Sequence, residues 1–123
     1  MHYEDPIKSE GAQSAVLRIY ASSSDRMNGK ILFEDIVLRA RDEGISGVTV
    51  YRGVMGFGLS THIHTSKFWE LTEKLPIVIE AVDEAEKLTA FFGQIEADLK
   101  ESAKGCLVTM DPVQVLLHQK GCR

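Results

Sequence analysis

Hydrophobic and polar residues follow strand-like patterns in four segments of this chain. These predicted strands span residues 14–21, 47–55, 77–82 and 106–110. The first carries large side chains on both faces, with Val16, Arg18 and Tyr20 on one and Leu17 and Ile19 on the other. Burial on both faces is typical of a strand in the middle of a sheet.

Two other segments have apolar residues at helical spacing. The first helix is predicted from Ile31 to Glu43, and Gly44 ends it because glycine tolerates a positive φ. The second is predicted to start in a capping box, with Asp83 as N-cap and Glu86 at the third helical position. Its apolar stripe consists of Leu88, Phe91, Phe92, Ile95 and Leu99.

The remaining segments connect these elements. A long connection, residues 56–75, shows no strong strand signal, although residues 66–73 suit a helical turn. Pro76 opens the third strand, where a missing N–H is tolerated. Residues 113–117 are expected to form a short edge strand after Pro112. The order β-α-β-loop-β-α-β is the ferredoxin-like arrangement, an α+β fold with two helices on one face of a four-stranded antiparallel sheet.

Such a sheet has one face without helices. Its outward strand residues include valine, isoleucine and tyrosine, so an uncovered face exposes a larger apolar patch than a monomer tolerates. We therefore expect the chain to form an oligomer in which sheets pack against each other.

Composition narrows the class of protein. The 123 residues fit one domain, which we place at residues 15–117, between a flexible leader at 1–14 and a tail at 118–123. A net charge of −4, without a run of lysine and arginine, disfavours nucleic acid as a partner. The sequence has neither the apolar stretch of about 20 residues that spans a bilayer nor the apolar core of a signal peptide. Together with only two cysteines, Cys106 and Cys122, this predicts a cytoplasmic protein that is not inserted in a membrane.

The stretch from Gly47 to Lys67 concentrates the candidate chemistry. Gly53, Gly56 and Gly58 follow a strand, and a glycine-rich strand end can bring backbone N–H groups close to an anion. The alternative is that these glycines only let the chain leave the sheet. No helix opens directly after them, so they are not a dinucleotide-binding fingerprint.

His62 and His64 point the same way in an extended segment and are able to share a metal ion. No third ligand lies nearby in sequence, so we do not assign a metal site. The alternative is that one histidine hydrogen-bonds an anion or a neighbouring subunit.

Arg52 lies on the second predicted strand between apolar residues, and a buried arginine needs a partner. Its planar guanidinium suits a phosphate, and the alternative is an intersubunit ion pair with Glu80, which is predicted on the adjoining strand. Lys67 and Lys30 are weaker candidates for contacts with an anion, while Thr65 adds a hydroxyl beside His64.

Other residues give weaker signals. Phe68, Trp69 and Leu71 suit a stacking platform for a base or, alternatively, an anchor for the loop. Cys106 is expected to be a small buried hydrophobic residue. We find no catalytic motif, and we therefore do not expect an enzyme.

Several segments together resemble the PII-like signalling proteins and, within that superfamily, a family of small bacterial proteins of unknown function. They are residues 17–20, 26–32, 44–58, 64–67 and 75–80, and the resemblance extends over roughly residues 14–117. It implies a ferredoxin-like homotrimer with its sheets facing a central axis. It also implies that the connection after the second strand corresponds to the T-loop, with nucleotides bound between subunits at its base. A membrane channel, such as a fluoride channel, or a transporter is an implied partner.

The sequence departs from PII proteins in two places. Leu59 and Ser60 follow Gly58, where PII proteins have an arginine-glutamine pair that contacts the ligands. Residues 101–106 hold one glycine and one lysine, where PII proteins have a glycine-rich, basic phosphate-binding loop. Both departures argue against the standard ATP and 2-oxoglutarate binding mode, but an adenine nucleotide bound differently stays compatible with the sequence.

The leading hypothesis is a trimeric, PII-like regulator that binds a small anionic ligand between subunits and signals through the loop after the second strand. Its candidate ligand-binding residues are Arg52, Gly53, Gly56, Gly58, His64, Thr65 and Lys67. The alternative is a metal-binding trimer that resembles the CutA proteins, which rests on His62 and His64.

Overall fold

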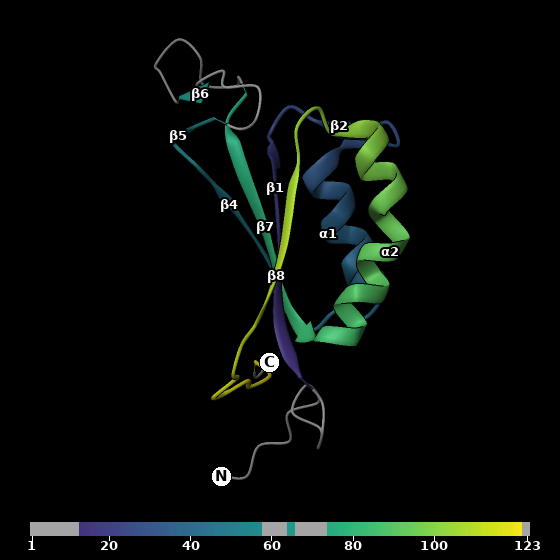
Figure 1. The fold of residues 1–123 in the computed structure, drawn as a ribbon, viewed down its shortest axis with the longest axis vertical. Coiled ribbons are helices and arrows are strands. Elements are labelled where there is room, and N and C mark those ends of the chain that lie inside the picture. Colours follow the sequence, from purple (N-terminus) through teal and green to yellow (C-terminus); the bar gives the residue numbers. More distant parts are fainter. Residues whose placement is uncertain (1–12, 58–63, 66–73, 122–123) are drawn as a thin grey trace.

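The computed structural model describes residues 13–57, 64–65 and 74–121. Its elements are β1 (Ser14–Ser22), β2 (Arg26–Met27), β3 (Lys30–Ile31), α1 (Leu32–Asp42), β4 (Val48–Arg52), β5 (Met55–Gly56), β6 (His64–Thr65), β7 (Pro76–Glu84), α2 (Ala85–Ser102) and β8 (Leu107–Pro112). Four of the strands form an antiparallel sheet in the order β4-β7-β1-β8. Both helices cover the same face of this sheet (Figure 1). The predicted ferredoxin-like α+β fold is therefore confirmed.

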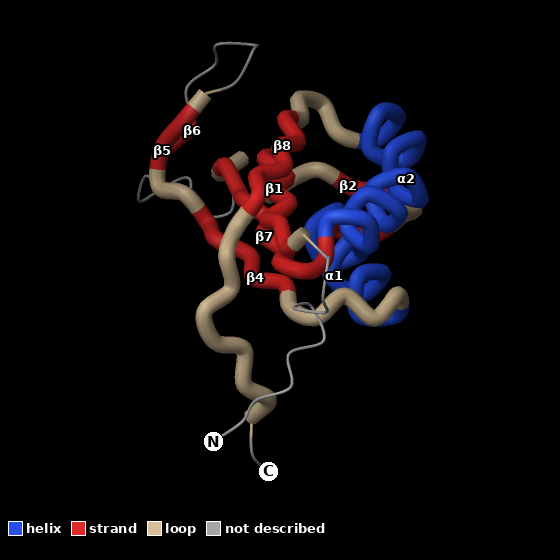
Figure 2. The backbone as a smooth tube through the Cα atoms, turned by 60° about the horizontal axis from the view of Figure 1, so that its bottom comes forward, coloured by secondary structure: helices blue, strands red, loops and turns tan. Residues whose placement is uncertain are grey.

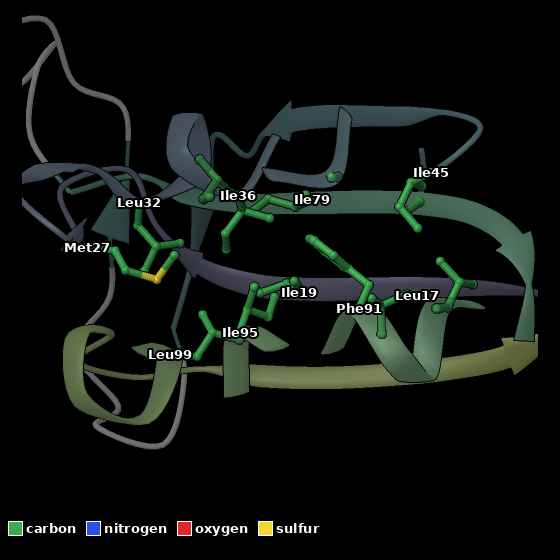
Figure 3. Packing of buried hydrophobic residues seen from close by; sticks show 14 of the residues in the cluster. Leu17, Ile19, Met27, Leu32, Ile36, Ile45, Ile79, Phe91, Ile95 and Leu99 are labelled. Atoms are coloured by element: carbon green, nitrogen blue, oxygen red, sulfur yellow. The ribbon is translucent and has the colours of Figure 1, made fainter. Parts of the chain in front are cut away.

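The pairing of β1 with β7 determines which residues form the core. The two strands pair over nine residues, from Ser14 opposite Glu84 to Ser22 opposite Pro76. Because side chains alternate between faces, one face of both strands points toward the helices. The buried residues on that face include Leu17, Ile19 and Ile79, which pack against buried residues of α2 (Figure 3). β1 lies between β7 and β8, so its prediction as a central strand is correct.

The helix α1 ends as the sequence predicts. Gly44 has a φ of +79°, and its N–H donates to the carbonyl of Arg41 at 3.0 Å. The N–H of Ile45 donates to the carbonyl of Ala40 at 3.0 Å. The glycine therefore lets the chain reverse while its own N–H caps a helical carbonyl.

The predicted capping box of the second helix is wrong. Asp83 still belongs to β7, and α2 has Glu84 as its N-cap residue, without a side-chain hydrogen bond to the helix. The Asp83 carboxylate is buried and accepts hydrogen bonds from the N–H groups of Ser46 at 2.9 Å and Glu84 at 2.7 Å. β7 extends this far because Glu84 still pairs with Ser14 in the sheet.

A small hairpin between β1 and α1 was not predicted. Strands β2 and β3 pair across Asn28 and Gly29, whose φ values of +56° and +76° are typical of a two-residue hairpin turn. The Asn28 amide donates to Asp35 and Asp98, both at 3.4 Å, which ties the turn to α1 and α2. Hydrogen bonds from Arg39 and Asn28 hold the pKa of Asp98 below its ordinary value. The Asn-Gly pair was the available sequence signal.

The end of the domain differs from the prediction in two respects. β8 starts at Leu107, one residue later than expected, and Cys106 before it is exposed, so the expectation that it is buried is wrong. Residues 113–117 form no strand. Pro112 already pairs with Ala15, and β1 begins only one residue before that, so the sheet offers little further strand for this segment to join.

The buried Asp83 gives a testable prediction for stability. Asp83→Ala leaves the N–H groups of Ser46 and Glu84 without their acceptor, so the free energy of unfolding should fall by about 1–3 kcal/mol. Chemical denaturation at pH 7 measures this. Asp42→Ala is the control, because the Asp42 side chain is 72% exposed, and it should change stability by less than about 0.5 kcal/mol. Equal losses in the two variants would contradict the assigned role of Asp83.

Candidate functional site

The long connection between β4 and β7 begins and ends at one end of the sheet. Arg52, the last residue of β4, lies opposite Ile77. The N–H of the next residue, Gly53, donates to the carbonyl of Pro76 at 2.7 Å. This bond joins the two ends of the connection, so residues 53–75 form a loop that is closed at its base.

Strands β5 and β6 bring part of the loop back on itself. Met55 pairs with Thr65 and Gly56 with His64, so these two short strands form an antiparallel ribbon. The ribbon lies beyond the end of the sheet and away from the helices (Figures 1 and 2). The structure thus brings Gly56, His64 and Thr65 together, a few residues from Arg52. The candidates Gly58 and Lys67 lie outside the described residues, as do His62, residues 59–60 and the predicted helical turn at 66–73.

Gly53 is explained by close packing against Pro76. A Cβ atom on Gly53 would lie 2.9 Å from Cγ of Pro76, which is too close, whereas one on Gly56 would lie in ordinary contact at 3.4 Å from the same atom. Neither residue has a positive φ. Among the described glycines, Gly29 and Gly44 have one. Gly53 therefore lets the loop approach the first residue of β7, and the backbone of both glycines lacks the alternating geometry of an anion-binding nest.

Arg52 is exposed and does not pair with Glu80 within one chain, so an ion pair between subunits stays a prediction. The register places Glu80 opposite Thr49 on β4, three residues before Arg52. Side chains three positions apart on a strand point to opposite faces, and Arg52 therefore lies on the other face from Glu80. Among the described residues, Arg52 takes part in no ion pair. Its guanidinium is thus open to an external anion.

Glu80 instead belongs to a row of polar side chains on the face of the sheet without helices, which we call the outer face. Glu80 accepts hydrogen bonds from Arg18 at 2.9 Å and from the Tyr51 hydroxyl at 3.2 Å. Arg18 also contacts Asp111 at 3.4 Å, so the row crosses all four strands. The hydrogen bond with Glu80 raises the pKa of Arg18. The centre of the outer face is therefore more polar than expected, and exposed apolar groups such as Leu107 lie beside it.

A shallow cavity of about 320 Å³ lies between α2 and β8, where the sequence suggested no site. Phe92, Leu99 and Val108 are among its apolar lining residues, and Lys104 and Cys106 also line it. Although Cys106 is exposed as a residue, partial desolvation of its thiol in this cavity and, to a lesser degree, the Asp25 carboxylate raise the pKa of the thiol, which disfavours a reactive thiolate. This region corresponds to residues 101–106, which the sequence resemblance already distinguished from a basic phosphate-binding loop.

Metal-binding residues do not gather in the part of the chain that the structure describes. No three histidine, cysteine, aspartate or glutamate side chains there are placed to hold a metal ion. His62 lies outside that part, so the pair with His64 stays a prediction. Lys30, the other cation considered, contacts Asp35 at 3.8 Å and is 61% exposed. None of the described helices is long and apolar enough to cross a membrane.

Comparisons with known proteins show what this chain is similar to. Residues 14–115 match the sequence model of the DUF190 family, described as an uncharacterized ACR. A UPF0166 protein of Aquifex aeolicus is 34% identical over 82% of this chain and 91% of its own length. A second match from that organism is 31% identical over 84% of this chain and 97% of its own length.

A solved structure with the same fold is that of CPII bound to ADP and bicarbonate, from Thiomonas intermedia K12. The TM-score is 0.57 at 16% sequence identity, with 82% of this chain and 88% of the other chain covered. At this identity the likeness shows the fold, which is that of a PII-like protein.

Close packing at Gly53 gives a second prediction. Gly53→Ala places a methyl group 2.9 Å from the Pro76 ring, so the free energy of unfolding should fall by about 1–3 kcal/mol. Gly47→Ala is the matched control, since a Cβ atom there meets nothing within 4 Å. Thermal and chemical unfolding of both variants measure the difference. An unchanged Gly53→Ala variant would show that the base of the loop is not closed as described.

Proposed function

Because this chain belongs to the DUF190 family and has the fold of a PII-like protein, we propose that it is a homotrimeric regulator. In this proposal it binds a small anionic ligand, an adenine nucleotide, in the clefts between subunits. Ligand binding orders the connection between β4 and β7 and thereby changes its docking to a protein partner.

The observation that carries the proposal is the position of Arg52. Its guanidinium is exposed and unpaired among the described residues, and it stands at the point where β4 ends and the loop begins. An arginine fork in this position offers two parallel hydrogen bonds to a phosphate or carboxylate. Gly53 and Gly56 shape the base of the loop, and β6 carries His64 and Thr65 beside it. Gly58 and Lys67 complete the proposed ligand-binding set.

Two observations support the class of ligand that we propose: the ligands bound to a protein with the same fold, and the positive charge near the base of the loop. CPII, the solved structure that shares the fold, is bound to ADP and bicarbonate, which are both anions. Among the described residues, the exposed cations at the base of the loop are Arg52 and Lys74, which are few for a highly charged ligand. We therefore propose ADP or AMP ahead of ATP, held in a manner that does not use the arginine-glutamine pair of PII proteins.

The ribbon supports a signalling role for the loop. Met55 of the ribbon is 62% exposed, and the flanking residues Val54 and Phe57 are 74% and 66% exposed. Such an apolar group on a projecting element suits burial against a protein partner. We propose that this partner is a membrane channel or transporter and that the contact is made from the cytoplasm.

Isothermal titration calorimetry tests the ligand. We expect heat of binding with ADP or AMP, measured with and without bicarbonate, for protein purified without a histidine tag. Arg52→Ala should weaken this binding at least about tenfold, which corresponds to one lost charged hydrogen bond of about 1.4 kcal/mol or more.

Arg41→Ala is the matched control, because the Arg41 side chain is 74% exposed on α1 and lies in the helix layer. It should leave the affinity unchanged. The absence of binding heat with ATP, ADP, AMP and cyclic nucleotides would refute the nucleotide proposal. Equal affinities of wild type and Arg52→Ala would refute the assigned role of Arg52.

A further inference from the structure

The segment after β8, residues 113–121, runs along the side of the sheet away from the helices (Figures 1 and 2). We call this segment the arm. It starts beside β1, where the N–H of Val113 donates to the carbonyl of Ser14 at 3.0 Å. The arm therefore lies on the same side of the molecule as the outer face of the sheet.

The two ends of the outer face differ in exposure. Val16 points to the outer face, yet it is only 6% exposed. Tyr20, on the same strand and the same face, is 39% exposed. The arm starts beside the less exposed end of β1, next to Ser14.

Two leucines of the arm point away from the body of the protein. Leu116 is 81% exposed and Leu117 is 66% exposed, whereas Val115 and His118 on either side are half-buried. Two adjacent and exposed leucines form a compact apolar group, and it lies beside an open sheet face. Such a group is typical of a contact that the isolated chain does not complete.

The area of the outer face fits a contact between copies of this chain. Four strands about 4.8 Å apart, each paired over about six residues, give a projected face of roughly 400 Å². A stable interface buries about 800 Å² of accessible surface on each partner, and the accessible surface of a folded protein is larger than its projection. The sheet face and the adjacent arm together therefore approach what a stable assembly of this chain needs.

The charges on the outer face are compatible with cover by a second copy. Arg18 is already paired with Glu80 at 2.9 Å and contacts Asp111 at 3.4 Å within one chain. Because Arg18 already has acidic partners in its own chain, an apolar group from another copy can cover this row without leaving the guanidinium unpaired. A second copy presents the same exposed apolar residues, Tyr51, Leu107 and those of the arm. Both sides of such a contact therefore contribute apolar surface.

We propose that the arm is an intersubunit clamp, in which Leu116 and Leu117 of each copy pack against the outer-face side of the next copy. This inference rests on the homotrimer of the proposed function and names the residues that hold it together. The contact is heterologous, since the arm of one copy meets the sheet of another, and such contacts close into a ring when the rotation permits.

Sedimentation velocity of the full-length chain at about 1–50 μM tests the clamp. We expect wild type to sediment as a trimer and a Leu116→Asp/Leu117→Asp variant to dissociate to monomers, with at least a 100-fold weaker association. Leu38→Asp is the matched control, because Leu38 is 41% exposed on α1 in the helix layer and should leave the trimer intact. Circular dichroism should show the same fold in all three proteins, since the replaced side chains are exposed.

The outcomes separate the clamp from the trimer. A trimeric wild type with an equally trimeric double variant would overturn the clamp and leave the proposed homotrimer standing. A monomeric wild type over this range would overturn both. Should the double variant fail to fold, a photo-crosslinking residue at position 116 replaces it. Crosslinks between two chains, absent when the same residue stands at position 38, support the clamp, and crosslinks only within one chain or to another protein overturn it.

Discussion

The nine-residue antiparallel pairing of β1 with β7 is the constraint on which the rest of the structure depends. It places Leu17 and Ile79 toward the helices and Arg18 and Glu80 toward the outer face. A slip of one residue would exchange the two faces and bury the charges in the core. The core and the Arg18–Glu80 ion pair therefore specify the same register, and the pairing continues far enough to keep Asp83 in the strand.

The same pairing positions the candidate site, because β4 takes its register from β7. Because Arg52 lies opposite Ile77, β4 ends where β7 begins, and the loop starts beside Pro76. This arrangement explains two features that the sequence patterns did not predict, the position of Arg52 and the need for glycine at position 53. Arg52 is separated from Glu80 by strand alternation, and Gly53 is required by the distance to Pro76. An exposed cation at the base of a closed loop is thus a consequence of strand register.

Local periodicity was sufficient to predict the fold but not the contacts within it. Strand alternation, helical spacing and the positive φ at Gly44 depend on neighbours in sequence, and these predictions are confirmed. Asp83 was misread because its partner Ser46 lies 37 residues away and has no local signature. The Asn28-Gly29 turn had a local signal that was overlooked, whereas the Pro76 contact of Gly53 required the register of two strands. Contacts between distant segments therefore account for most of the differences, including the unpaired Arg52.

Charge links the proposed ligand to the proposed assembly. Before β8, Lys100 is engaged with Glu96 at 3.1 Å and Lys104 is the remaining lysine of that segment. Arg52 stands on the other edge strand of the sheet, since β4 and β8 are the two edges. Arg52 and Lys104 thus stand at opposite edges of the sheet of one chain, too far apart to hold one small anion together. In the proposed ring, the β4 edge of one copy lies next to the β8 edge of another, and this arrangement brings Arg52 and Lys104 together. In the proposed trimer, ligand binding and assembly therefore stabilise each other, because an anion held by both edges binds the ring more tightly than the single chain.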